Sequence, residues 1–564
     1  MIIRALCAAL FFNASAALAE DRAFDAQDLT EELASIVKGR GGAEPVAGAA
    51  LVVMVGDEIV FSGAAGCAEF DATHTRKCLR PIKPTSKLRV ASISKMALAM
   101  GFATLAEAGR ADFDRDISDY LGWRLVNPNF PDLPITARRL LSHTSSIRDP
   151  EEYWVAAPGK FRNFIVGAEE LFAAPSLGGA EEAIWFKYAN INYGILAGLI
   201  ERAANQRFDL YMSEHVFGPA GLDIGYNWSG VSANARKVGA ALVERDGKGW
   251  RTIVDGPTVL GDNLPYFLAS DTLNRAEYLE NYAPGENPTL FSPQGGLRAS
   301  TADLAALVRL LNRFPVLTSA AWEYDPASPN GDSEAGFYSA YGLGVQIIDG
   351  GPDLLPNEVL IGHAGEAYGL YSGAWLLKKD EDKRREDVAI AYVVIGAGDA
   401  LEKGSNPSFY AIEERIIRLA AKAIPTAASS EATNPRPFDE SANAMQDVDA
   451  ALLSARSTGK MPLLVLGGNW CHDSRGLAAK FEVEPLKTLI GAEYQIVWID
   501  VGHRDRNLDV AARFGVDKII GTPTVIILSP DGEILNAGSV HDWRTADSKS
   551  FDETLSYFES FVRR

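Results

Sequence analysis

A serine and a lysine three residues apart, Ser92 and Lys95, could together form a nucleophilic site. On a helix, side chains at positions i and i+3 lie on one face, so the lysine amine can reach the serine hydroxyl. A serine attacks poorly until a base removes its proton, and a lysine kept neutral by burial can be that base. The apolar, alanine-rich run 96–108 that follows is typical of a buried helix. The sequence therefore predicts that Ser92 is a nucleophile and Lys95 its partner.

The bare spacing Ser-x-x-Lys has little specificity. It also occurs at Ser35–Lys38 and at Ser457–Lys460, where no neighbouring residues support chemistry. Two further motifs distinguish Ser92 from these matches.

The first of these motifs is Tyr188-Ala189-Asn190, which precedes an apolar, small-residue helix at 191–198. Tyr188 could carry a proton, and Asn190 could hold a substrate amide. Taken alone, the same pattern also fits a core tyrosine and a helix-capping asparagine.

The second motif is His363-Ala364-Gly365-Glu366, which comes before a strand-like run at 371–377. A glycine at this place would let a substrate backbone approach closely. Another histidine, His143, lies in Leu140-Leu141-Ser142-His143-Thr144-Ser145, and we expect it to be a buried structural residue that ties down a loop.

The three motifs, in this order and with these flanks, resemble those of the class C β-lactamase-related serine hydrolases. That group includes penicillin-binding carboxypeptidases, D-aminopeptidases and esterases, and the resemblance covers about residues 25–425. It implies an α/β fold of the β-lactamase/transpeptidase type, with an antiparallel sheet and a helical subdomain around the Ser92 helix. The segments 140–145 and 295–297 also look like structural signatures of this group.

The resemblance implies an acyl-enzyme mechanism. Ser92 would attack a carbonyl, while Lys95 and Tyr188 would share the proton transfers, with Tyr188 the donor to the leaving group. Asn190 would orient the acyl side. The oxyanion would lie between the backbone N–H groups of Ser92 and Glu366. No metal or organic cofactor is required.

The third motif departs from the Lys-Thr-Gly of true β-lactamases and many carboxypeptidases, where a lysine and a threonine favour a substrate carboxylate. His363 is largely neutral at pH 7 unless its surroundings perturb it, and Ala364 has no hydroxyl. This departure favours an esterase, amidase or D-aminopeptidase activity over a β-lactamase or carboxypeptidase activity.

The elements that must position these residues can be read from the same sequence. We expect a helix at 27–39, a hairpin of 49–55 and 58–64 around Gly56-Asp57, and strands at 343–348, 371–377 and 388–395. A helix at 410–423 closes this unit. A stretch rich in Ala, Ser, Glu, Asn and Pro, at 425–444, is predicted to be a linker.

The C-terminal residues 445–564 resemble a thioredoxin-like α/β domain. Cys471 is expected to begin a helix, after a strand at 461–467, and Pro523 resembles the cis-proline that faces that cysteine in the family. Ser474 stands where Cys-x-x-Cys has its second cysteine, so dithiol chemistry is not expected. A monothiol that forms mixed disulfides with a protein partner and a purely structural module both remain open. Trp470 precedes Cys471 and Pro523 should lie opposite, so we expect its sulfur to be partly accessible.

Composition sets the remaining limits. The 564 residues suggest two or more domains, and a net charge of −20 disfavours nucleic acid as a partner. Residues 1–19 are predicted to be a secretory signal peptide, with Ala17-Leu18-Ala19 as its cleavage site, and no transmembrane anchor is expected. We therefore expect a periplasmic protein. Export also favours a disulfide between Cys67 and Cys78 over two free thiols.

The sequence thus predicts a signal peptide at 1–19, a serine hydrolase domain at 20–424, the linker, and a thioredoxin-like domain at 445–564. The expected substrate is an ester or a D-amino-acid-containing amide, and cell-wall material is one source considered for it. The alternatives are a penicillin-binding D-alanyl-D-alanine carboxypeptidase, a β-lactamase, and a non-catalytic protein that binds wall fragments.

Overall fold

The computed structural model describes residues 26–40, 44–71, 76–174, 184–255, 265–378, 386–398, 401–424, 435–483, 485–549 and 551–562. Two compact units can be distinguished: Ala26–Glu381 together with Glu386–Ile424, and the described residues after 434. The predicted signal peptide at 1–19 and the first ten residues of the predicted linker lie outside the described residues. Among the described helices, none has the length and apolarity that a membrane span requires.

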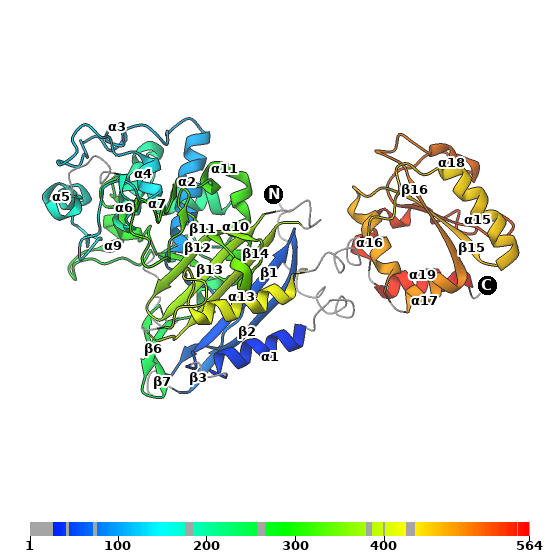
Figure 1. Ribbon diagram of the computed structural model, residues 1–564, viewed down its shortest axis with the longest axis horizontal. Coiled ribbons are helices and arrows are strands. Elements are labelled where there is room, and N and C mark those ends of the chain that lie inside the picture. The colour runs from blue at the N-terminus through cyan, green and yellow to red at the C-terminus, as the bar shows by residue number, and fades with distance from the viewer. Residues whose placement is uncertain are drawn as a thin grey trace. The chain divides into compact units, whose positions relative to one another are not determined.

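A large antiparallel sheet is the framework of the first unit (Figure 1). Its described strands, in spatial order, are β3 (Cys78–Pro81), β2 (Glu58–Phe70), β1 (Gly48–Val55), β14 (Val388–Ile395), β13 (Leu370–Leu377), β12 (Val359–Ala367), β11 (Gln346–Asp349), β10 (Ala340–Tyr341) and β9 (Trp322–Glu323). The central strands β13 and β14 are buried along their whole length, which explains why they are continuously apolar rather than alternating.

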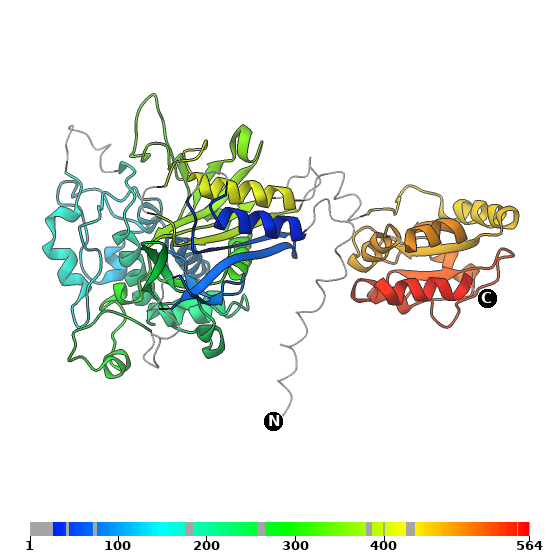
Figure 2. The ribbon, with the colours of Figure 1, turned by 90° about the horizontal axis from the view of Figure 1, so that it is seen from below.

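Helices cover both faces of this sheet. On one face, α1 (Ala26–Val37) and α13 (Ala411–Ala423) lie side by side over β1 and β2 (Figures 1 and 2). On the other face, α2 (Ile93–Glu107) packs against β12 and β13, and α10 (Thr301–Arg309) packs against β1, β13 and β14. The sheet and α2 therefore bring the first and third motifs of the sequence together.

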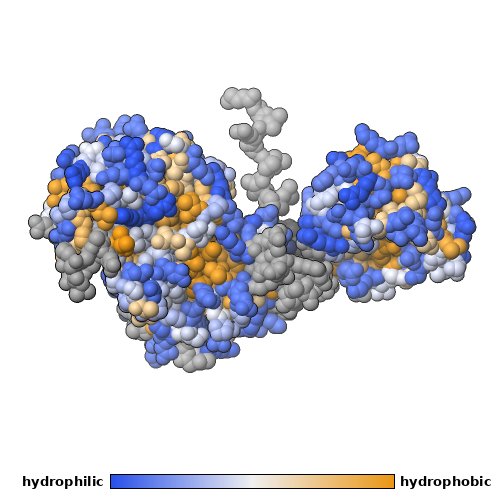
Figure 3. All heavy atoms as spheres, turned by 45° about the horizontal axis from the view of Figure 1, so that its top comes forward, coloured by the Kyte–Doolittle hydropathy of each residue, from blue (hydrophilic) through white to orange (hydrophobic). Residues whose placement is uncertain are grey.

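The remaining elements of this unit are mostly short, and among them α6, α7 and α11 pack against α2. The helices are α3 (Ser118–Leu121), α4 (Ala137–Leu141), α5 (Phe161–Gly167), α6 (Ile191–Ala204), α7 (Phe208–Met212), α8 (Ala233–Lys237), α9 (Arg275–Glu280), α11 (Pro315–Thr318) and α12 (Gly351–Leu354). The strands β4 (Leu88–Arg89), β8 (Leu297–Ala299) and β5 (Gly225–Tyr226) form one small sheet, and β6 (Leu242–Asp246) and β7 (Gly249–Val254) form another. The face seen in Figure 3 is mostly hydrophilic, with a few apolar patches.

Several predictions for this unit are confirmed. The hairpin around Gly56-Asp57 is present, with Val55 paired to Glu58, and the strand predicted at 388–395 has the predicted bounds. Cys67 in β2 and Cys78 in β3 form a disulfide, which links two neighbouring strands at the edge of the large sheet.

The C-terminal unit has helices on both faces of a small sheet. Strand β15 (Met461–Gly467) pairs in parallel with β16 (Tyr494–Asp500) and antiparallel with β17 (Thr524–Ile527). Alternate residues of β15 enter separate cores: Leu464 packs with helices α15 and α18, and Leu463 packs with α16, α17 and α19. The helices are α15 (Ala444–Thr458), α16 (His472–Phe481), α17 (Leu486–Glu493), α18 (Leu508–Arg513) and α19 (Phe551–Val562).

Candidate active site

Ser92 occupies the residue immediately before α2, at the end of the segment that leaves β4. Helix α2 has almost no polar face, and its residues from Ile93 to Ala103 are all buried, so it is a central core helix. Such a helix holds the residues of its first turn rigidly, because nearly every side chain behind them is packed. Ser92 itself remains partly exposed.

Lys95 lies one turn after Ser92, and its ammonium nitrogen faces three oxygen atoms. Its Nζ is 2.9 Å from Ser92 Oγ, 2.8 Å from Asn190 Oδ1 and 3.0 Å from the carbonyl oxygen of Gln294. The last two oxygens can only accept hydrogen bonds. A neutral amine that donates to both of them therefore directs its lone pair at the Ser92 hydroxyl.

The surroundings of Lys95 favour that neutral form. Burial lowers the pKa of Lys95 from its usual value to about 7, an effect that Asp149 opposes and Arg89 reinforces. A large fraction of Lys95 is therefore unprotonated near neutral pH, and the nitrogen can take the Ser92 proton.

Asp149 positions Asn190, a role that the sequence did not reveal. Its carboxylate accepts hydrogen bonds from the backbone N–H groups of Asn190 and Ile191, each at 2.8 Å, and from Asn190 Nδ2 at 2.9 Å. Asp149 thus caps the start of α6, and Asn190 makes no side-chain cap of its own. Because Nδ2 must face the carboxylate, Oδ1 must face Lys95.

Tyr188 is held between two rings. Its ring stacks on His143 with 4.3 Å between centroids and on Tyr338 with 5.1 Å. Burial raises the pKa of Tyr188 well above its usual value, whereas a hydrogen bond with Ser92 acts in the opposite direction. Tyr188 therefore remains a phenol, which suits it to donate a proton rather than to remove one.

A hydrogen-bonded chain links the two histidines. His143 Nδ1 accepts the N–H of Ala189, so its Nε2 carries the hydrogen and lies 3.3 Å from the Tyr341 hydroxyl. That hydroxyl lies 2.8 Å from His363 Nε2, and His363 Nδ1 faces the carbonyl oxygen of Ala364. One set of tautomers satisfies the whole chain with both imidazoles neutral.

Burial keeps both imidazoles neutral. It lowers the pKa of His143 well below its usual value, and it lowers the pKa of His363 to about 3, in both cases with help from Lys95. His143 has the buried structural position that the sequence predicted, with its side chain 0 % exposed. His363 is neutral, as the departure from Lys-Thr-Gly suggested.

Gly365 also allows two parts of the chain to approach each other closely. A Cβ at this position would lie 2.5 Å from the carbonyl oxygen of Val90 and 3.3 Å from the Cβ of Ala91. The glycine therefore lets β12 pack directly against the segment that carries Ser92.

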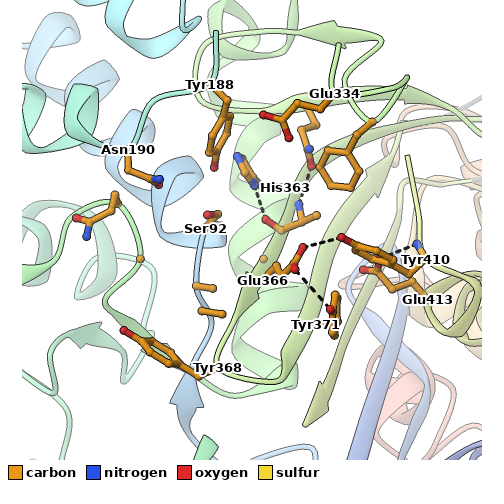
Figure 4. Close-up of a pocket in the computed structure, with 18 of the residues that line it drawn as sticks. Ser92, Tyr188, Asn190, Glu334, His363, Glu366, Tyr368, Tyr371, Tyr410 and Glu413 are labelled. Atoms are coloured by element: carbon orange, nitrogen blue, oxygen red, sulfur yellow. Dashed lines mark hydrogen bonds between the residues drawn. The ribbon is translucent and has the colours of Figure 1, made fainter. Parts of the chain in front are cut away.

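A cavity of about 550 Å³ joins these residues. Ser92, Tyr188, Asn190, His363, Gly365 and Glu366 all line it. Figure 4 shows Tyr188, Asn190, His363 and Glu366 around Ser92. Glu366, the residue expected to offer a backbone N–H, also presents a carboxylate that accepts hydrogen bonds from Tyr410 at 3.0 Å and Tyr371 at 3.4 Å. Among the described residues, no cluster of side chains has the composition of a metal site.

The thiol of the C-terminal unit is less accessible than the sequence predicted. Cys471 does begin helix α16, but it is only 7 % exposed, so the prediction of a partly accessible sulfur is wrong. The segment before β17 covers it, and its Sγ donates to the carbonyl oxygen of Thr522 at 3.3 Å. Thr522 and Pro523 are joined by a cis peptide bond. Ser474 is fully buried, and its Oγ has no partner among the described residues.

The geometry agrees with a comparison of the whole sequence with known families. Residues 33–408 match the Beta-lactamase family. The chain belongs to this family.

Individual curated proteins match over shorter stretches. Penicillin-binding protein 4* of Bacillus subtilis (strain 168) is 29% identical over 171 residues, which are 30% of this chain and 35% of that protein. A D-aminopeptidase of Cereibacter sphaeroides (strain KD131 / KCTC 12085) is 30% identical over 210 residues, or 36% of this chain and 34% of that protein. The chain thus spans about a third of the length of these curated relatives.

Among solved structures, the D-amino acid amidase from Ochrobactrum anthropi SV3 in complex with L-phenylalanine amide covers 70% of this chain and 98% of its own. Its sequence is 18% identical, and its TM-score is 0.47.

Proposed function

We propose that the unit Ala26–Ile424 is a serine hydrolase that cleaves an ester or a D-amino-acid-containing amide through an acyl-serine intermediate. The observation that carries this proposal is the set of contacts of Lys95. Its nitrogen is 2.9 Å from Ser92 Oγ, and its other two neighbours are oxygens that cannot donate. This arrangement is what a general base beside a serine nucleophile needs.

The proposed reaction has two stages. Lys95 takes the proton of Ser92 as its oxygen attacks the substrate carbonyl, and Tyr188, held as a phenol, delivers a proton to the leaving group. The oxyanion is stabilised by the backbone N–H groups of Ser92 and Glu366. Water then attacks the acyl-serine and releases the acid.

The proposed substrate class follows from the third motif. His363 has a pKa of about 3 and is 1 % exposed, so it cannot supply the positive charge that a lysine gives to a carboxylate-binding pocket. A substrate without a carboxylate at this point is therefore favoured. The D-aminopeptidase among the relatives is consistent with such a class.

Intact-mass spectrometry tests the nucleophile and the substrate class together. The full-length protein is incubated with p-nitrophenyl acetate, a D-amino-acid p-nitroanilide or benzylpenicillin. An acyl adduct on the wild type that is absent from Ser92→Ala supports the proposal. Ser35→Ala is a matched control, because Ser35 also lies three residues before a lysine.

Three results would contradict the proposal. Unchanged turnover in Ser92→Ala would remove Ser92 as the nucleophile. Efficient turnover of penicillin, comparable to that of the best ester, would favour the β-lactamase or carboxypeptidase alternative. Absence of any adduct, together with tight binding of wall fragments, would favour a non-catalytic binding protein.

We also propose that the protein is exported to the periplasm, on the basis of the signal-like residues 1–19, and that it meets its small-molecule or wall-derived substrate there. The C-terminal unit is proposed to be a thioredoxin-like module. Its Cys471 at a helix start beside Pro523 supports this assignment, and the burial of Cys471 favours a structural role over exchange with thiol partners.

A further inference from the structure

One part of the cavity beside Ser92 is lined by aromatic rings and carboxylates. Phe337 and Tyr410 contribute rings, and Glu334, Glu366 and Glu413 contribute carboxyl groups. Figure 4 shows Glu366 with Tyr371, Tyr410 and Glu413 on one side of Ser92. We refer to this part of the cavity, which is formed by Phe337, Tyr410, Glu334, Glu366 and Glu413, as the cation box.

An alkylammonium group already occupies the box. The Nζ of Lys403 lies 4.3 Å from the ring centroid of Phe337 and 4.2 Å from that of Tyr410. These distances are typical of a cation held by aromatic faces. A backbone bridge between Lys403 and Tyr410 holds the lysine in this position.

The box carries more negative than positive charge. Glu334, Glu366 and Glu413 all act electrostatically on the ammonium of Lys403, and Lys187 also acts on Glu334 from outside the box. None of the ion pairs among the described residues includes Glu334 or Glu366. The carboxylate of Glu366 is oriented by the hydroxyls of Tyr371 and Tyr410. Burial raises the pKa of Glu334, and it raises the pKa of Glu413 to about 7, so Glu413 adds only part of a charge near neutral pH. The box is therefore suited to a cation and unsuited to a second anion.

A buried donor in the same cavity has no partner. Gln346 is 1 % exposed and lines the cavity, and its Oε1 accepts the N–H of Ala364 at 2.8 Å. That contact fixes the orientation of the amide, because a backbone N–H can only donate. Its Nε2 then has no hydrogen-bond partner among the described residues. A buried donor of this kind calls for an acceptor, which a ligand carbonyl oxygen would provide.

We propose that the cation box binds an alkylammonium group of the substrate, and that Lys403 occupies the box until the substrate displaces it. The substrate class is thus an ester or amide that carries a primary ammonium and, within reach of the same cavity, a carbonyl oxygen for Gln346. The ammonium and the scissile carbonyl share one cavity, so both can be bound at once. The part of this proposal that names an ester or amide rests on the proposed function. The part that names an ammonium group does not.

Calorimetric titration of n-butylammonium tests the box without any catalysis. The full-length Ser92→Ala protein is compared with Ser92→Ala/Lys403→Ala at pH 7.5. Removal of a tethered competitor, whose effective concentration is in the millimolar range, should tighten n-butylammonium binding by about fivefold or more. Neutral n-butanol should bind equally to both proteins.

Matched variants separate occupation of the box from net charge. Ser92→Ala/Lys248→Ala removes an exposed lysine from the turn between β6 and β7 and should leave n-butylammonium binding unchanged. Glu366→Gln, added to Ser92→Ala/Lys403→Ala, should weaken it again. Unchanged binding in the Lys403→Ala protein would overturn the proposal.

A titration with butyrate tests whether the site binds an anion instead of a cation. If Lys403→Ala weakens butyrate binding and leaves n-butylammonium binding unchanged, Lys403 is an anion-binding residue and the proposal is wrong. Every titration uses protein with Ser92→Ala, which needs no catalysis. These binding results therefore remain interpretable even if the hydrolase proposal fails. Conversely, an acyl-enzyme with no preference for ammonium-bearing substrates would overturn the box alone.

Discussion

Replacement of Asp149 by asparagine should change the pH dependence of hydrolysis. The Asp149 carboxylate opposes the fall in the pKa of Lys95 and holds the Asn190 amide by a hydrogen bond of 2.9 Å. Loss of its negative charge makes the Lys95 ammonium less favourable. The pKa of Lys95 should therefore fall below its present value of about 7.

The size of this change can be worked out from the contacts. Asn190 bridges the two groups, with 2.8 Å between its Oδ1 and Lys95 Nζ. This bridge puts the carboxylate about 6 to 8 Å from Nζ, where one charge contributes about 2 kcal/mol at an effective dielectric constant near 20. That free energy corresponds to a pKa lower by about 1.5.

The assay is kcat/KM on an activated ester between about pH 5 and 9, because this ratio reports groups of the free enzyme. The rising acid limb of the wild type should have its midpoint near the pKa of Lys95. In Asp149→Asn that limb should move to lower pH. The plateau should also fall, because the asparagine cannot accept all three hydrogen bonds that the carboxylate accepts.

Asp114→Asn is the matched control. It removes a carboxylate that pairs with Arg138 at the surface, so it should leave the acid limb where it is. An acid limb that stays in place in Asp149→Asn, or that moves to higher pH, would refute the assignment of Lys95 as the base under the influence of Asp149.

Two further predictions concern stability and the thiol. The pKa of His363 is lower when folded than when unfolded, so the unfolding free energy should fall by about 1.4 kcal/mol per unit as pH drops from about 6.5 towards 3. In denaturant titrations, the unfolding free energy of His363→Gln should fall less steeply with decreasing pH than that of His472→Gln, which replaces a histidine whose side chain is 72% exposed. Equal slopes of unfolding free energy against pH would contradict a buried neutral imidazole at His363. Iodoacetamide should label Cys471 slowly in the native protein and fast after unfolding, and Ser474→Cys should gain no disulfide reductase activity. Rapid native labelling, or a gain of that activity, would show that the burial of Cys471 does not prevent exchange.

The sequence predicted the features that depend on local spacing. The position of Lys95 one turn after Ser92 follows from helix geometry, and the hairpin at Gly56-Asp57 follows from turn chemistry. The partners that complete the site were not predicted. Asp149 reaches Asn190 across 41 residues, and the Gln294 carbonyl reaches Lys95 across 199.

These omissions have a physical cause. A backbone carbonyl such as that of Gln294 has no signature in the sequence, because every residue carries one. Asp149 is one of many acidic residues, and only the fold puts it at the start of α6. The exposure of Cys471 was wrong for a similar reason, since the residues that cover it, near Thr522, come 51 positions later.

His363 shows how a prediction can be correct for an incomplete reason. The sequence argument used the ordinary pKa of histidine, which would allow a positive charge to return at about pH 5. The structure buries this imidazole, and the Tyr341 hydroxyl lies 2.8 Å from its Nε2, so the group remains neutral well below that pH. Acidification therefore cannot restore the cation that a Lys-Thr-Gly motif supplies. The proposed preference against substrates with a carboxylate at this point therefore depends on the packing around His363, and not on its titration.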